Sequence, residues 1–142
     1  MHIVTHLSDR ISRQLSTEQI DALIIEFVNY KSGKGSQYFG RDELYNRPAS
    51  AVDASLRHAH IHPHFLQGLP VTRQNNTEKK WRLQSIPFHR TSDTHLIYCQ
   101  GIRMQNHYKL LAFLKTGAHD YAKMTSNIGM LADEAELFQR KY

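Results

Sequence analysis

Histidine is the most conspicuous chemical feature of this chain, with ten among 142 residues. Four histidines occur at alternate positions in the stretch LRHAHIHPH: His58, His60, His62 and His64. On a β-strand these four side chains would share one face. Alternating histidines can converge on a metal such as zinc, or one or two of them can handle protons and phosphates on an open sheet face. A solvent-facing edge strand without a chemical role is the third interpretation.

A second group of chemically capable residues lies further along the chain. Arg90, Asp93 and His95 come first, and His119 and Tyr121 follow. Histidine exchanges protons near neutral pH, and arginine presents planar, charged donors to phosphate. Asp93 can orient a histidine and fix its tautomer, or it can cap its own turn. Tyr121 can stack on a base or donate a hydrogen bond, although a tyrosine that opens a helix more often packs.

Strand-like runs are expected to position these groups. Leu83–Phe88, His95–Gln100 and Tyr108–Lys115 are rich in Leu, Ile, Phe and Tyr and are bounded by turn formers, which predicts an antiparallel meander. Both faces of His95–Gln100 are partly apolar, as in a central strand. The β-branched run Ile3–Leu7 predicts a short first strand.

Helices are expected in the chain before and after the three strand-like runs. Ser16 and Gln19 have the spacing of a capping box, and apolar residues at helical spacing follow as far as Val28. Phe39–Tyr45 is interpreted as a turn leading into a short helix. The chain after Asp120 again shows a helical pattern, which we expect to pack against the sheet.

Length and composition indicate one ordinary globular domain spanning residues 1–142. The formal net charge of +5 suits a polyanionic partner or an acidic protein. Lys79, Lys80 and Arg82 flank Trp81, and such a group can grip a phosphate backbone and stack on a base, or form a solvated loop beside a core indole.

The cysteine count and the hydropathy indicate the cellular compartment in which the protein is expected. The single cysteine, Cys99, excludes an internal disulfide, and we expect a packed thiol in a cytoplasmic protein. No apolar run approaches the roughly 20 residues that span a bilayer, and no signal peptide is visible. We therefore expect no membrane partner.

The sequence resembles the YafO toxin family of the RelE/ParE-like superfamily, from about residue 15 to the end. Three stretches carry the resemblance: 39–45 (FGRDELY), 59–62 (AHIH) and 90–101 (RTSDTHLIYCQG). The run Leu110–Lys115 followed by His119 matches as well. The resemblance implies an α+β, RelE-like fold. In it, an antiparallel sheet of three C-terminal strands and an N-terminal strand is packed by N-terminal helices and a C-terminal helix.

The resemblance also implies a function. Such a toxin would be a ribosome-dependent mRNA endoribonuclease that stops translation, and a small cognate antitoxin would hold it inactive. Its partners would be that antitoxin, the ribosome and mRNA, and no cofactor or metal is expected.

Metal-independent RNA cleavage needs a base for the ribose 2′-hydroxyl, a cation for the phosphate and an acid for the departing 5′-oxygen. His119 is our candidate acid, and His60 or His62 the candidate base. Arg90 is assigned to the phosphate, and Asp93 and His95 would support the histidines. A missing base would not exclude the activity, because RelE-like toxins often borrow groups from ribosomal RNA. Candidate RNA-binding residues are Arg41, Lys79, Lys80, Arg82 and Tyr121.

Two other functions remain open from the sequence. The chain could be a nuclease that cuts or nicks free RNA or DNA without the ribosome, with the alternating histidines as metal ligands. It could also be a non-catalytic, ParE-like toxin that blocks DNA gyrase by binding. A pure binding toxin has no need of the histidine and arginine set.

Overall fold

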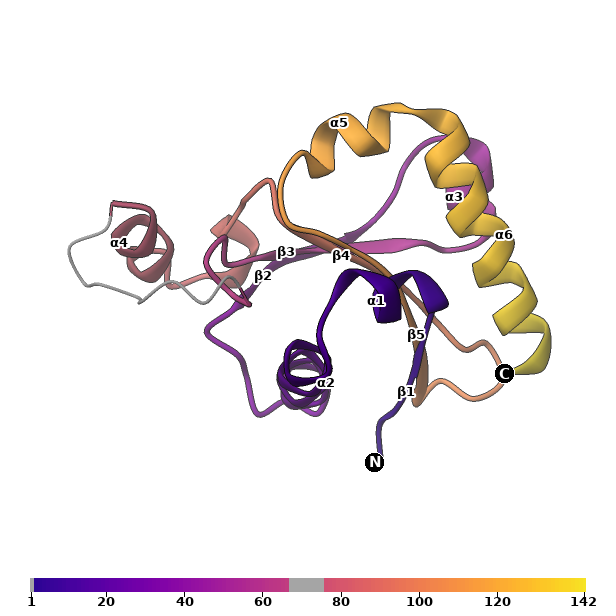
Figure 1. The fold of residues 1–142 in the computed structure, drawn as a ribbon, viewed down its shortest axis with the longest axis horizontal. Helices are drawn as coiled ribbons and strands as arrows, with labels where there is room; N and C mark the ends of the chain where they lie inside the picture. The colour runs from indigo at the N-terminus through magenta and orange to yellow at the C-terminus, as the bar shows by residue number, and fades with distance from the viewer. Residues whose placement is uncertain (1, 67–75) are drawn as a thin grey trace.

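A five-stranded sheet forms the centre of the computed structural model, which describes residues 2–66 and 76–142 (Figure 1). The strand order is β1-β5-β4-β3-β2, with β1 parallel to β5 and every other neighbouring pair antiparallel. The strands are β1 (Val4–Leu7), β2 (Phe39–Leu44), β3 (Arg57–Ile61), β4 (His95–Gln100) and β5 (His107–Leu114).

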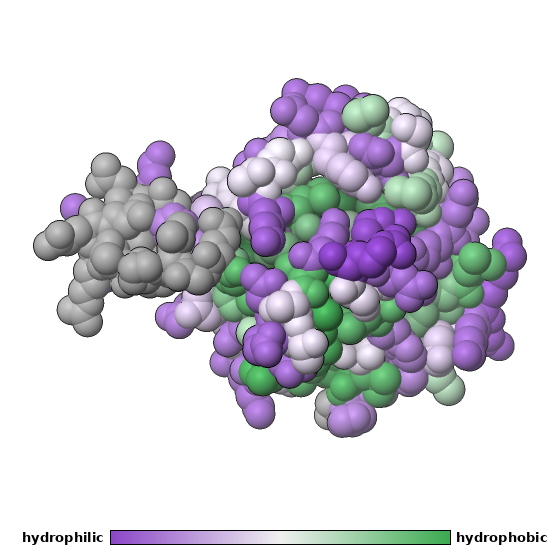
Figure 2. Space-filling model, in the orientation of Figure 1, coloured by the Kyte–Doolittle hydropathy of each residue, from purple (hydrophilic) through white to green (hydrophobic). Residues whose placement is uncertain are grey.

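Helices cover both faces of this sheet (Figure 1). On one face lie α1 (Asp9–Gln14) and α2 (Thr17–Lys31). On the other lie α3 (Ala49–Asp53), α5 (Ala118–Lys123) and α6 (Thr125–Lys141). Outside these layers are α4 (Asn76–Leu83) and the 3₁₀ turn η1 (Pro87–His89), which packs beside β2. Figure 2 shows apolar residues gathered between the two helical layers, with polar residues over the outside of the helices.

Alternation along the central strand β4 separates two hydrophobic cores. Leu96 and Tyr98 pack toward α1 and α2, whereas Ile97 and Cys99 pack toward α6. All four are fully buried, and each large apolar side chain so buried contributes roughly 1.5–3 kcal/mol to folding. Burial raises the pKa of the Cys99 thiol to about 12, so this cysteine is the packed, unreactive thiol that its apolar surroundings predict.

The α+β fold class is confirmed, and so are several elements. The strand His95–Gln100 has the expected bounds, Tyr108–Lys115 is shifted by one residue, and the N-terminal strand lies in the sheet. Ser16 caps α2 in the expected capping box with Gln19. The tail after β5 is helical as expected, but Met124 adopts an extended conformation that divides it into α5 and α6.

Two predicted elements are wrong. The apolar run Leu83–Phe88 is not a strand: α4 ends at Leu83, and η1 begins at Pro87. Proline cannot donate to a ladder, and the side chains of Leu83 and Phe88 remain more than half exposed. Phe39–Tyr45 does not lead into a helix, because Phe39–Leu44 pairs with β3 as strand β2. Tertiary pairing outweighs the weak local preference there.

Among the described residues, no helix combines the length and the apolarity that crossing a membrane requires.

We predict that Phe113→Ala lowers the free energy of unfolding by about 3–5 kcal/mol, because this β5 side chain is 3% exposed in the core beneath α1 and α2. Phe88→Ala is the matched control. The Phe88 side chain is 51% exposed, and its truncation should change stability by no more than about 0.5 kcal/mol. Urea unfolding followed by circular dichroism measures both. Equal losses for the two variants would contradict the assigned core.

Candidate active site

Three histidines from three elements meet on the α6 side of the sheet. His60 on β3 and His95 on β4 are direct cross-strand neighbours, and their ring centroids lie 4.2 Å apart. His119, in the first turn of α5, lies with its ring centroid 4.9 Å from that of His95 and 6.0 Å from that of His60. The predicted alternation is confirmed for this part of the histidine run, since Ala59 and Ile61 point into the opposite core.

A single residue, Ser92, fixes the tautomers of the two buried histidines. Its backbone N–H donates to Nδ1 of His60 at 2.8 Å, so neutral His60 carries its ring proton on Nε2. Its carbonyl oxygen lies 3.0 Å from Nε2 of His95. A carbonyl can only accept, so His95 also carries its proton on Nε2, and its Nδ1 keeps a free lone pair.

Asp93 holds the third histidine. Its Oδ1 accepts from the backbone N–H of His119 at 2.9 Å and from His119 Nδ1 at 2.7 Å. Its Oδ2 accepts from the N–H of Gly117 at 2.7 Å. Gly117 takes a left-handed conformation (φ 72°) that suits glycine. These bonds, with that from the His119 N–H the largest cause, lower the pKa of Asp93, and they leave His119 Nε2 free on a side chain that is 60% exposed.

The buried imidazoles are held neutral. Burial, followed by the neighbouring His58 and His119, lowers the pKa of His60 to about 4. Burial, followed by His60 and His58, lowers the pKa of His95 to about 3. Burial likewise lowers the pKa of His58. Desolvation disfavours the charged form of each ring, so these three histidines add no positive charge to the folded protein near neutral pH.

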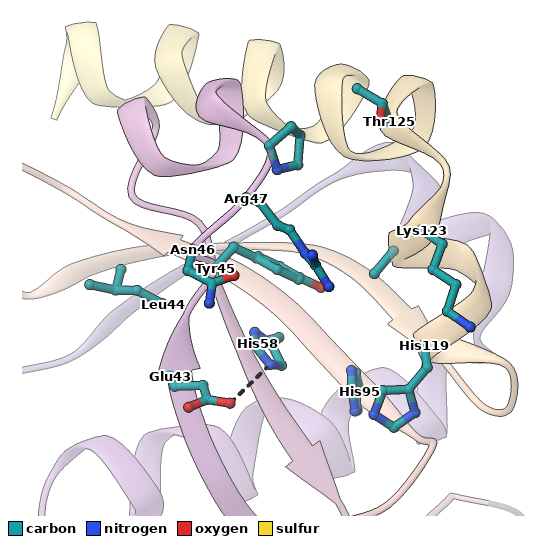
Figure 3. Close-up of a pocket in the computed structure, with 12 residues that line it drawn as sticks. Glu43, Leu44, Tyr45, Asn46, Arg47, His58, His95, His119, Lys123 and Thr125 are labelled. Carbon is teal, nitrogen blue, oxygen red and sulfur yellow. Dashed lines mark ion pairs between the residues drawn. The ribbon is translucent and has the colours of Figure 1, made fainter.

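A cleft of about 650 Å³ opens beside His95 and His119 (Figure 3). Arg47, from the loop between β2 and α3, and Lys123, at the end of α5, extend into it from different sides. Thr125 places the first turn of α6 at the cleft wall. The N-terminus of a helix attracts anions through its free N–H groups and its dipole. The cleft therefore joins a free imidazole nitrogen with Arg47, Lys123 and a helix N-terminus. Lys123 also pairs with Asp120 at 3.5 Å, and Glu43 adds one carboxylate to the lining.

Arg41 lies at the other rim of the histidine cluster. It is on β2, its Nε donates to the carbonyl of Phe88 at 2.8 Å, and its guanidinium stacks 4.2 Å from the centre of the Phe88 ring. Its positive charge contributes to the lowered pKa of His60. The structure thus brings together His60, His95, His119 and Asp93, with Arg41 at the edge.

Other candidate residues lie elsewhere. Arg90 lines a second pocket of about 370 Å³ with Lys80 and Trp81. Its Nε donates to the carbonyls of Trp81 and Gln84, which is a structural use of the side chain. His62 is 2% exposed and packs against Trp81 with ring centroids 5.3 Å apart.

The remaining predicted RNA-binding residues are spread over the surface. Lys79 and Arg82 are exposed on α4. Tyr121 is half-buried against the α6-side core, and burial raises its pKa. This contact is the packing that the sequence offered as an alternative, and a role in RNA binding stays a prediction.

Comparison with known proteins identifies the family. The family model described as "Toxin YafO, type II toxin-antitoxin system" matches residues 28–140. The chain belongs to this family. The mRNA interferase toxin YafO of Escherichia coli (strain K12) is 33% identical over 135 residues, which cover 93% of this chain and 94% of the relative. No solved structure matches the chain.

Sequence reasoning missed several residues that line the cleft of this YafO-family toxin. Glu43 lies on β2, which was not expected to be a strand, and Tyr45 and Arg47 follow it. No period-two alternation of polarity marks this strand in the sequence, because Arg41, Asp42 and Glu43 are all charged. In the structure, Arg41 and Glu43 share the face of His58 and His60. Tyr45 stacks on His58 with ring centroids 4.3 Å apart. Lys123 carries no local signal, because only the packing of α5 brings it to the site.

The neutral histidines predict a loss of stability in acid. In the unfolded chain these rings take up protons near pH 6.5, whereas in the folded toxin His60 does so only near pH 4. The unfolded state therefore binds more protons across this window, and the free energy of unfolding falls as the pH falls from about 6.5 to about 4. Urea unfolding in EDTA-containing buffers measures the slope.

The matched control is His60→Gln, which removes one of these groups and should flatten the slope. A wild-type midpoint that stays constant or rises on acidification would show that the rings are already protonated in the folded toxin.

Proposed function

We propose that this YafO-family toxin is an mRNA interferase, an endoribonuclease that cuts mRNA on the ribosome without a metal. The similarity to the mRNA interferase toxin YafO of Escherichia coli supports the reaction class. The observation that carries the proposal is the exposed His119 imidazole, held through Nδ1 by Asp93 beside a cleft lined by Arg47 and Lys123. The whole chain would act as one toxin domain in the cytoplasm, and a cognate antitoxin would neutralise it.

The reaction joins the ribose 2′-oxygen to phosphorus and breaks the bond from phosphorus to the 5′-oxygen, leaving a 2′,3′-cyclic phosphate. We assign the protonation of the leaving 5′-oxygen to His119, because its Nε2 faces solvent and its Nδ1–H is held by a carboxylate. Arg41, Arg47, Lys123 and the N-terminus of α6 would supply positive potential for the phosphate chain.

His60 fits a different role from the base expected from the sequence. Its lone pair on Nδ1 is occupied by the Ser92 N–H, so Nε2–H can donate a hydrogen bond to a phosphate oxygen but cannot accept a proton. His95 is buried and has a pKa of about 3. Within the described cluster, His119 is thus the one exposed imidazole. We therefore infer that the ribosome or its RNA removes the 2′-hydroxyl proton, which makes cleavage ribosome-dependent.

The first test replaces His119. We expect His119→Ala to lower cleavage by about 10²- to 10⁴-fold, the usual contribution of one acid–base group, while the thermal midpoint stays unchanged because the side chain is exposed. Transcript ends are mapped by primer extension in a translation reaction and on naked RNA. A chelator selective for transition metals over magnesium is present throughout. His89→Ala is the matched control, because His89 is an exposed histidine on the η1 turn, outside the cleft and at the second pocket.

Wild-type protein should cut only the translated transcript. Cutting of naked RNA would contradict the proposal. So would nicking of plasmid DNA in a parallel reaction without the chelator, if adding the chelator stops that nicking. Growth arrest by His119→Ala without transcript cleavage would support a binding toxin instead.

The second test compares the two cations of the cleft, Arg47 and Lys123, with Arg90, whose side chain bonds backbone carbonyls. Arg47→Ala and Lys123→Ala should each weaken cleavage at subsaturating ribosome concentration by about tenfold, as for one lost charged hydrogen bond, with unchanged thermal midpoints. Arg90→Ala should lower the thermal midpoint, because Arg90 bonds two carbonyls and covers Trp81. If Arg90→Ala stops cleavage at full stability while the two cleft variants cut normally, the phosphate site lies in the second pocket.

A further inference from the structure

The histidine cluster has the geometry of a metal site. One ring nitrogen from each of His60, His95 and His119 lies within 4.8 Å of the other two. Neutral imidazole nitrogens are the usual ligands of zinc and neighbouring transition metals. Two of the three rings are buried and kept neutral by desolvation, and this is the protonation state that a metal requires.

Two of the histidines already make the outer contacts that orient a metal ligand. His119 Nδ1 donates to Asp93 at 2.7 Å, and His95 Nε2 donates to the Ser92 carbonyl at 3.0 Å. A carboxylate or carbonyl behind a ligating histidine fixes its tautomer and raises its basicity. Both rings therefore present the opposite nitrogen, His119 Nε2 and His95 Nδ1, as a lone pair.

The Nδ1 atom of His95 is buried without a hydrogen-bond partner among the described residues. His95 is 3% exposed, and its Nδ1 has no hydrogen-bond partner within the described part of the chain. Buried polar atoms without partners are rare and costly. A cation bound between His95 and His119 would satisfy this atom, and the exposed side of His119 gives the ion a path inward.

His60 is the least prepared of the three ligands. Its Nδ1 accepts the Ser92 N–H, so its ring proton occupies Nε2. A metal on Nε2 must displace that proton and disturb the Ser92 bond. The loss of one buried hydrogen bond weakens binding by about 10- to 100-fold. The site is therefore expected to bind zinc reversibly rather than to depend on it for folding.

We propose that His60, His95 and His119 bind a single transition-metal ion such as Zn²⁺, and that this ion switches off RNA cleavage. The second clause rests on the proposed function, because zinc on Nε2 of His119 removes the nitrogen assigned to the leaving oxygen. A neighbouring group, Glu43, His58 and His60, also brings three ligand atoms within 4.8 Å. It shares His60, so one ion excludes the other, and it lacks both the Asp93 contact and the unpartnered His95 nitrogen.

Binding is tested without RNA. The full-length chain is freed of metal by EDTA dialysis and titrated with Co²⁺, whose visible absorption reports nitrogen ligation. Zn²⁺ affinity then follows by competition with a colorimetric chelator near pH 7.5. We expect one ion per chain. Because the Asp93 carboxylate lies behind a ligand, Asp93→Asn should weaken binding by about 10- to 100-fold, and His119→Gln should weaken it at least as much.

His58→Gln is the matched control, because His58 lies beside the proposed site but belongs only to the competing group. It should leave zinc affinity unchanged. Absence of stoichiometric binding would overturn the site, as would an affinity lost in His58→Gln and kept in His119→Gln. The exposure of His119 makes its variant safe to interpret, and circular dichroism confirms that each variant is folded.

The activity arm uses the translation reaction with added Zn²⁺. Cleavage should fall with the midpoint set by the measured affinity, and the transition-metal chelator should restore it. Full cleavage by zinc-loaded toxin would overturn the regulatory claim while the metal site stands. A metal-free wild-type chain that cuts no translated transcript would instead refute the proposed function, because zinc binding is measured independently of RNA.

Discussion

The Asp93 carboxylate is the constraint on which the site depends. It joins the turn before β4 to the turn after β5, because its two oxygens accept three N–H groups from Gly117 and His119. Its side chain is 52% exposed, so the geometry comes from several converging bonds rather than from burial. Two of these N–H groups belong to the start of α5, where a helix leaves donors without internal partners. The Asp93 carboxylate therefore caps the N-terminus of α5 and fixes the orientation of the His119 imidazole.

Burial divides the histidines into two kinds. His60 and His95 lie at the base of the cleft as neutral rings. The backbone N–H of Ser92 bonds His60, and the backbone carbonyl of Ser92 bonds His95. His119 rises above them with one nitrogen free. A charged floor would repel cationic groups in the cleft, and neutral rings exert no such repulsion. The high histidine content thus produces a polar surface without fixed charge, and the permanent cations stay at the rims.

Local sequence signals predicted the helices and strands that are determined by neighbouring residues in the chain. The capping box at Ser16 and Gln19 depends on neighbours in sequence, and the strand His95–Gln100 is a short apolar run bounded by turn formers. Phe39–Leu44 is a strand because β3 offers a ladder, and Leu83–Phe88 is not one because Pro87 and exposure leave it without a partner. The same limit applies to the site. His60, His95, His119 and Asp93 could be named from residue type, but the cleft positions of Arg47 and Lys123 come from the packing of loops and helices around the sheet.

In the proposed mechanism, the histidine cluster is an incomplete acid–base set. One exposed imidazole can serve one proton transfer, and the second has to come from elsewhere. On free RNA the 2′-hydroxyl is neither deprotonated nor aligned, and correct alignment alone is worth many orders of magnitude in rate. In the mechanism proposed above, a ribosome that holds the message in place would supply both the alignment and the additional groups. Burial lowers the pKa of His60 to about 4 and that of His95 to about 3, which makes both rings poor bases.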